Sequence, residues 1–113
     1  MQVIQAGVPA EAGPWYAQAN EHMNSGNFDL AVELYDKVIE NSPACAMAYH
    51  NKGDCLDRLG KSGEAIACYN KAIEIDPYDA ESWYNKGMTL QKLGNPGESL
   101  HCTERAIDLA MGR

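Results

Sequence analysis

Long apolar runs and aromatic residues are scarce in this sequence, and both absences restrict what the protein can be. No stretch approaches the roughly 18 apolar residues that a membrane-spanning helix needs. One Phe, two Trp and six Tyr among 113 residues leave aliphatic side chains and Ala to form most of the core. A domain of this size buries only about two-thirds of its unfolded surface, so we expect one domain without a deep catalytic cavity.

Basic residues are also in the minority. Nine Lys and Arg stand against sixteen Asp and Glu, which gives a formal net charge of −7. A protein that binds nucleic acid by neutralising phosphates, or that adheres to anionic lipids, needs the opposite balance. The composition therefore predicts neither a nucleic-acid partner nor a membrane partner.

The N-terminus and the cysteines indicate a reducing compartment. Residues 1–14 have neither the basic nor the apolar region of a secretory signal, and we expect a cytoplasmic protein. The cysteines form no close pair such as CxxC, which favours buried, reduced thiols over a disulfide scaffold or a metal site. No metal or other cofactor is predicted. The four cysteines are Cys45, Cys55, Cys68 and Cys102.

A 34-residue repeat dominates the sequence. A shift of 34 residues aligns Trp15 with Tyr49 and Trp83. The same shift makes the triplet at 51–53, Asn-Lys-Gly, recur at 85–87. We expect a flexible N-terminal tail at 1–11 and one domain at 12–113, built from units at 12–45, 46–79 and 80–113.

Each unit is expected to form two antiparallel helices joined by a tight turn. Asp79 is a candidate N-cap for a helix over 80–93, and Gly94 can end that helix because glycine readily adopts a positive φ. Asn95 and Pro96 suit the start of the next helix. No segment alternates with period two, so the sequence predicts no strands.

On these residues the chain resembles the tetratricopeptide repeat family. The resemblance covers residues 12–113 and implies an all-α solenoid of three helix-turn-helix units in a right-handed superhelix. The first helix of each unit, the A helix, then lines a concave groove. The middle unit carries the family pattern of aromatic and small residues best, at Tyr49, Gly53, Leu56, Ala65, Tyr69, Ala72 and Pro77.

Family members commonly have a further C-terminal helix over the last repeat, and this sequence stops before one. Leu100, Ile107 and Met111 are therefore expected to be partly exposed. This favours either self-association through the last helix or a chain that is a piece of a longer protein. A rival prediction is that the apolar N-terminal segment folds back over apolar surface.

The resemblance implies a function without chemistry: a scaffold, not an enzyme, that binds a peptide segment of another protein in the groove. Amides can bond a peptide backbone, and Tyr and Met offer apolar pockets. Taken singly, most polar helix residues only face water. The candidate residues are Tyr16, Asn20, Met23 and Asn24 in the first unit, His50, Asn51, Asp54, Asp57 and Arg58 in the second, and Glu81, Tyr84, Asn85, Met88, Gln91 and Lys92 in the third.

The charges at the middle of this groove favour a basic partner. Asp54, Asp57 and Glu81 should attract Lys or Arg near the midpoint of a ligand. One family subclass instead holds a C-terminal carboxylate with two Asn and three basic residues. Here the basic positions hold Tyr16, Glu81 and Asn85, so such a clamp is not expected.

An alternative function uses His50 with Asp54 or Asp57 in a catalytic or metal-dependent regulator. His50 and Asp54 are four residues apart and share one helix face, where an orienting hydrogen bond is feasible. No nucleophile, phosphate-binding glycine loop or third metal ligand accompanies them in the sequence, so the binding scaffold is the preferred hypothesis.

Overall fold

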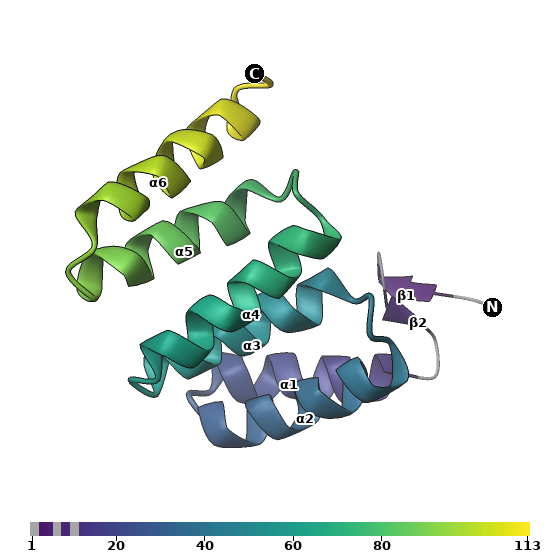
Figure 1. The fold of residues 1–113 in the computed structure, drawn as a ribbon. Coiled ribbons are helices and arrows are strands. Elements are labelled where there is room, and N and C mark those ends of the chain that lie inside the picture. The colour runs from purple at the N-terminus through teal and green to yellow at the C-terminus, as the bar shows by residue number, and fades with distance from the viewer. Residues whose placement is uncertain (1–2, 6–7, 10–11) are drawn as a thin grey trace.

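The computed structural model describes residues 3–5, 8–9 and 12–113, with side chains from Ala12 onward. Successive helices pair into three stacked layers in this part of the chain (Figure 1). Each predicted unit contains one pair, so the all-α helical solenoid is confirmed. The helices are α1 (Gly13–Asn24), α2 (Phe28–Asn41), α3 (Ala46–Arg58), α4 (Ser62–Ile75), α5 (Ala80–Lys92) and α6 (Pro96–Ala110).

Local capping fixes the bounds of the third pair as the sequence predicts. The Asp79 side chain accepts a hydrogen bond from the backbone N–H of Glu81 at the start of α5. Gly94 follows α5 with a φ of +77°, which lets its N–H and that of Asn95 bond back to the helix. The Asn95 side chain then accepts from the N–H of Glu98, with Pro96 in the first turn of α6.

The prediction that the chain has no strands is wrong at the N-terminus. β1 (Val3–Gln5) and β2 (Val8–Pro9) form an antiparallel pair with an irregular register. Strands of three and two residues are too short to show a period-two pattern, although β-branched residues favour them. Both strands contact α1. That this segment covers apolar surface stays a prediction. The flexibility of the tail at 1–11 stays a prediction, and residues 1–2, 6–7 and 10–11 lie outside the described residues.

Small residues let the two helices of a pair approach closely. A Cβ atom built on Gly53 of α3 would lie 2.8 Å from Cε1 of Tyr69 on α4, closer than real contacts allow. Tyr69 is buried, and so are Ala65 and Ala72 on the same helix. The predicted alternation of a ring with a small residue therefore forms the core of the second pair.

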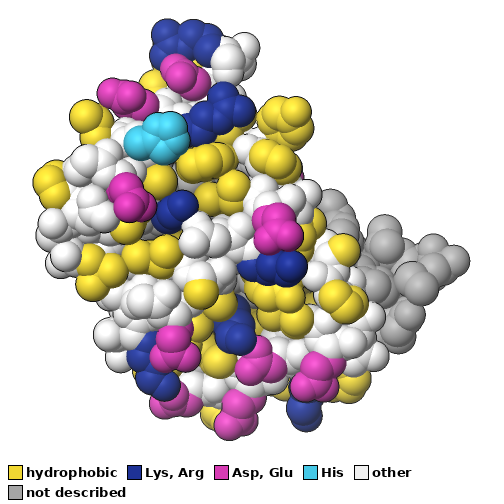
Figure 2. Space-filling model, viewed as in Figure 1, with side chains coloured by type: hydrophobic (Ala, Val, Ile, Leu, Met, Phe, Trp, Pro, Cys, Tyr) yellow, Lys and Arg dark blue, Asp and Glu magenta, His cyan; other side chains and the backbone are white. Residues whose placement is uncertain are grey.

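The last helix exposes apolar side chains, as predicted. Leu100, Ile107 and Met111 are each more than half exposed. Figure 2 shows hydrophobic surface between charged side chains over the end of the molecule that carries α6. Self-association through this helix stays a prediction. No helix in the described part of the chain has the length and hydropathy needed to cross a membrane.

All four cysteines are buried and unpaired in the described chain. Burial raises the pKa of each thiol, and that of Cys55 to about 11, with the nearby Asp54 charge adding to the effect. Because the thiolate is the reactive form, we expect little alkylation by iodoacetamide at pH 7.5 while the protein is folded. Four adducts should appear by intact mass after unfolding. Fewer than four would indicate a disulfide, and rapid labelling of the folded protein would contradict the packing of these helices.

Candidate functional site

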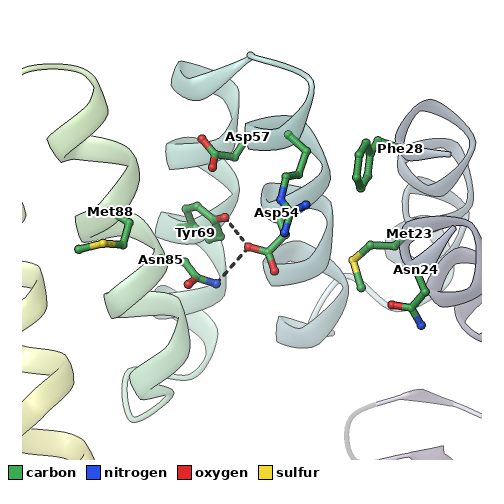
Figure 3. Close-up of a pocket in the computed structure, with 9 residues that line it drawn as sticks. Met23, Asn24, Phe28, Asp54, Asp57, Tyr69, Asn85 and Met88 are labelled. Atoms are coloured by element: carbon green, nitrogen blue, oxygen red, sulfur yellow. Dashed lines mark hydrogen bonds between the residues drawn. The ribbon is translucent and has the colours of Figure 1, made fainter. Parts of the chain in front are cut away.

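A pocket of about 490 Å³ lies across α1, α3 and α5 (Figure 3). Asp54 lies at its middle, with Met23 and Phe28 on one side and Met88 on the other. The lining residues are Met23, Asn24, Phe28, Asp54, Asp57, Arg58, Tyr69, Asn85 and Met88.

Seven of the fifteen candidate groove residues line this pocket, all those above except Phe28 and Tyr69. Those two side chains come from B helices, the second helices of the units. Phe28 begins α2 at the edge of the first turn, and Tyr69 on α4 reaches the pocket past Gly53. The 34-residue repeat identifies Tyr69 only as a packing residue. The signal that its ring reaches the pocket is Gly53, because this small residue on α3 leaves room for the ring.

The structure contradicts the prediction that Tyr16 and His50 present their side chains to the groove. Their exposed fractions are 2% and 7%. Each ring packs edge-on against the tyrosine of its own B helix, Tyr35 for Tyr16 and Tyr69 for His50. The repeat position shared by Tyr16 and His50 is therefore buried within its own unit, and residues of the next unit, Ser82 for His50 and Asn51 for Tyr16, also contact it.

The remaining candidates lie outside the 490 Å³ pocket. Asn20 and Asn51 are half-buried between α1 and α3. Glu81, Tyr84 and Lys92 are exposed on α5. Gln91, also on α5, lines a second hollow of about 240 Å³ beside α6, which it shares with Met88.

Two equivalent hydrogen-bond clusters join successive A helices. On the second unit, the Tyr69 hydroxyl donates to Asp54 Oδ1 at 2.6 Å, and Asn85 Nδ2 of the next unit donates to the same oxygen at 3.0 Å (Figure 3). On the first unit, Tyr35 donates to Asn20 Oδ1, and Asn51 Nδ2 lies 3.4 Å from that oxygen. We call these clusters the polar ladder.

The ladder occupies the N–H groups of two of the groove amides, Asn51 and Asn85. Asn51 Nδ2 also donates to the Tyr16 hydroxyl at 3.2 Å, and Asn85 Nδ2 also contacts His50 Nε2 at 3.2 Å. Each amide has two N–H groups, and both are directed at neighbours within the protein. Among the described residues, nothing donates to Oδ1 of Asn51 or Asn85, so both amide oxygens remain without a donor.

The polar ladder also affects the pKa values of Asp54 and His50. Burial alone would raise the pKa of Asp54, but hydrogen bonds from His50 and Tyr69 and the nearby positive charges lower it. Burial alone would lower the pKa of His50, but Asp54, Asp79 and Glu81 together raise it. Asp54 therefore stays ionised at neutral pH, and His50 titrates above its ordinary range.

Asp57 and Arg58 carry the other charges of the pocket. Asp57 Oδ2 pairs with Lys92 Nζ at 2.6 Å, so the acidic centre is partly neutralised. Asp57 Oδ1 is buried and has no hydrogen-bond partner in the described chain. The Arg58 guanidinium lies 5.8 Å from the centre of the Phe28 ring. Figure 3 shows that Phe28 lies on the opposite side of Asp54 from Met88. One carboxylate oxygen at this site thus lacks a donor.

The arrangement of His50 does not suit nucleophilic catalysis. Ser82 Oγ lies 2.7 Å from His50 Nδ1, a distance at which histidine could activate a hydroxyl. Ser82 is fully buried, however, and its hydroxyl donates to Asp79 Oδ2 at 2.8 Å. A substrate cannot reach it without unfolding this part of α5. In the described residues, no three His, Cys, Asp or Glu side chains come together to hold a metal ion.

Comparison with known proteins gives the same architecture. Solved structures of similar fold include MamA, with 21% identity and a TM-score of 0.86, covering 89% of this chain and 59% of that one. The second TPR of Spaghetti (RPAP3), bound to the HSP90 peptide SRMEEVD, has 22% identity and a TM-score of 0.85, covering 88% and 93%. The TPR2B domain of yeast Sti1, in a pHsp70 complex, has 26% identity and a TM-score of 0.84, covering 87% and 78%.

A comparison with curated protein sequences finds no match. Two family models described as tetratricopeptide repeat do match, over residues 16–80 and 68–101. The first of these alone covers more than half of the sequence. The chain therefore belongs to the tetratricopeptide repeat family.

Proposed function

We propose that this protein is a non-catalytic scaffold that binds a basic peptide segment of a partner protein in the pocket of α1, α3 and α5. The observation that carries the proposal is the polarity of the pocket. Asp54 and Asp57 line it, and Asn85 directs its N–H groups at Asp54 and His50, which leaves its oxygen without a donor in the described chain. Two carboxylates and a carbonyl oxygen favour a ligand that carries a positive charge and N–H donors.

Arginine fits this pocket best. Its guanidinium carries several N–H donors in one plane, so it can bond a carboxylate and an amide oxygen together. Met23 and Met88 offer flexible apolar surface to the stem of the side chain. The net charge of −7 steers a cationic segment toward the protein at low salt.

The similar structures support a peptide ligand. One of them is bound to an HSP90 peptide, the acidic SRMEEVD, and another is in a pHsp70 complex. We expect a different ligand here, because Asn51 and Asn85 direct their N–H groups inward and Glu81 would repel a carboxylate. A basic segment from the interior of a partner chain has no terminal carboxylate, so it needs no N–H donors from these amides and is not repelled by Glu81.

A matched peptide series tests the proposal. The acetylated and amidated peptide GSLRLSG should shift the backbone amide resonances of the pocket residues in ¹H–¹⁵N spectra. Replacing its Arg by citrulline, which keeps the shape and removes the charge, should abolish the shifts. Asp57→Asn should weaken the Arg peptide by about 1–2 kcal/mol of binding free energy.

Asp108→Asn is the control, because Asp108 lies on α6 and pairs with Arg113, away from the pocket. It should leave the affinity unchanged. Equal shifts from the Arg and citrulline peptides, or shifts confined to the B helices around Lys37, Lys71 and Arg105, would refute binding of a basic segment in this pocket.

A further inference from the structure

His50 occupies the place in the second unit that Tyr16 occupies in the first. The Tyr16 ring lies 6.0 Å from the Tyr35 ring, and the His50 ring 5.8 Å from the Tyr69 ring, each pair at an interplanar angle of 65°. The next unit contacts both with an asparagine. The first unit thus shows the same junction built without a group that titrates near neutral pH.

Neighbouring hydrogen bonds fix the neutral tautomer of His50. Ser82 has one hydroxyl proton and directs it at Asp79 Oδ2, a carboxylate oxygen that can only accept. The contact of 2.7 Å between Ser82 Oγ and His50 Nδ1 therefore needs a proton on Nδ1. Nε2 of the neutral ring carries a lone pair, which accepts the hydrogen bond from Asn85 Nδ2.

Asp54 is a second neighbour of Nε2, and unlike Asn85 it can bond to Nε2 only when that atom carries a proton. Asp54 Oδ2 lies 3.4 Å from Nε2, and Asn85 Nδ2 lies 3.2 Å from it. Without a proton, Nε2 accepts from Asn85. With a proton, Nε2 donates to Asp54, and its N–H faces the N–H of Asn85, which must turn away. The protonation state of His50 Nε2 therefore decides whether this atom bonds to Asn85 or to Asp54.

We propose that His50 is a positioning residue for the pocket, which holds the Asn85 amide with its oxygen toward the ligand when neutral and releases that amide when protonated. The inference rests on the proposed function for its effect on binding, but the movement of Asn85 is a property of the free protein. Asn85 Nδ2 donates to Asp54 Oδ1 at 3.0 Å. If the amide keeps this bond as it turns, its second N–H should face the pocket.

The groups around His50 set the direction of the effect. Asp54 faces it from α3, Asp79 and Glu81 from the start of α5, and the Tyr69 ring from α4. These three carboxylates favour the protonated ring, and burial opposes it. Protonation of His50 places a positive charge beside a pocket that would otherwise attract cations, and the turned Asn85 amide adds an N–H donor to it. Basic ligands should therefore bind more weakly below the pKa of His50, and their binding should lower that pKa.

Side-chain NMR of the free protein tests the positioning role directly. Between pH 5 and 8.5, the side-chain amide resonances of Asn85 should shift with the same midpoint as the His50 ring. Asn51 is the internal control, because its partner Tyr16 does not titrate in this range. Its side-chain resonances should stay constant. An Asn85 side chain that does not follow His50, or an Asn51 side chain that shifts equally, would overturn the proposal.

His50→Tyr recreates the junction of the first unit and separates positioning from simple packing. This variant should keep the Asn85 amide resonances near their high-pH values at every pH. The wild-type affinity for GSLRLSG should fall about threefold to tenfold from pH 8 to pH 5.5, and the variant should lose most of that change. An undiminished pH dependence in a folded variant would exclude His50 as its source. If GSLRLSG binds at neither pH while Asn85 still follows His50, the proposed ligand is wrong and the positioning role stands.

Discussion

Tyr69→Ala should destabilise the protein by about 3–5 kcal/mol, a large part of the stability of a domain of this size. The ring is fully buried between Gly53 and His50, and its removal leaves a cavity that helices α3 and α4 cannot close. The hydroxyl also supplies a donor to Asp54. Urea denaturation followed by circular dichroism measures the loss in the free energy of unfolding.

Two further variants show how much of the lost stability comes from the ring of Tyr69 and how much from its hydroxyl. Tyr69→Phe keeps the ring and removes only the donor to Asp54, so it should cost about 1–2 kcal/mol. Tyr78→Ala, at an exposed tyrosine after α4, should change the stability little. If Tyr69→Ala cost no more than Tyr78→Ala, Tyr69 could not anchor the second helical pair.

Ala72→Phe should cost about 1–3 kcal/mol or more, because it inserts a ring where no space remains. Ala72 is fully buried and lies on the same face of α4 as the buried residues Ala65 and Tyr69. Ala67→Phe is the matched control, since Ala67 lies on the same helix and is exposed. The midpoint of chemical denaturation should fall for Ala72→Phe and stay close to the wild-type value for Ala67→Phe. Equal midpoints would mean that the register of α4 is different.

The sequence alone was sufficient for the helical fold, and the reason is repetition. The 34-residue pattern recurs in every unit, and the helix signals at Asp79, Gly94 and Asn95 all take the predicted roles. A pattern seen three times also fixes the register between helices, which a single amphipathic helix does not. The strands at Val3–Gln5 and Val8–Pro9 have no such repetition and were missed.

The pocket was predicted less completely, because side-chain direction depends on the neighbouring unit. Position along an A helix identified Asp54, Asp57 and Asn85 as pocket residues. It could not show that the amide of Asn85 points inward, since that follows from the contacts with Asp54 and His50. Tyr16 was assigned to the groove for the same reason: only the packing of Tyr35 and α3 buries it.

The polar ladder has a consequence for the thermodynamics of recognition. It ties α1 to α3 through Asn51 and Asn20, and α3 to α5 through Asn85 and Asp54, directly beneath the pocket. The floor of the site is thus preorganised, and a peptide that enters it spends little of its binding energy on ordering the receptor. Changes in the floor would also alter the spacing of the A helices. Ligand preference is therefore best retuned at Met88, which lines the pocket and bonds to neither cluster in the described chain, whereas Met23 Sδ lies 3.7 Å from the Tyr35 hydroxyl of the ladder.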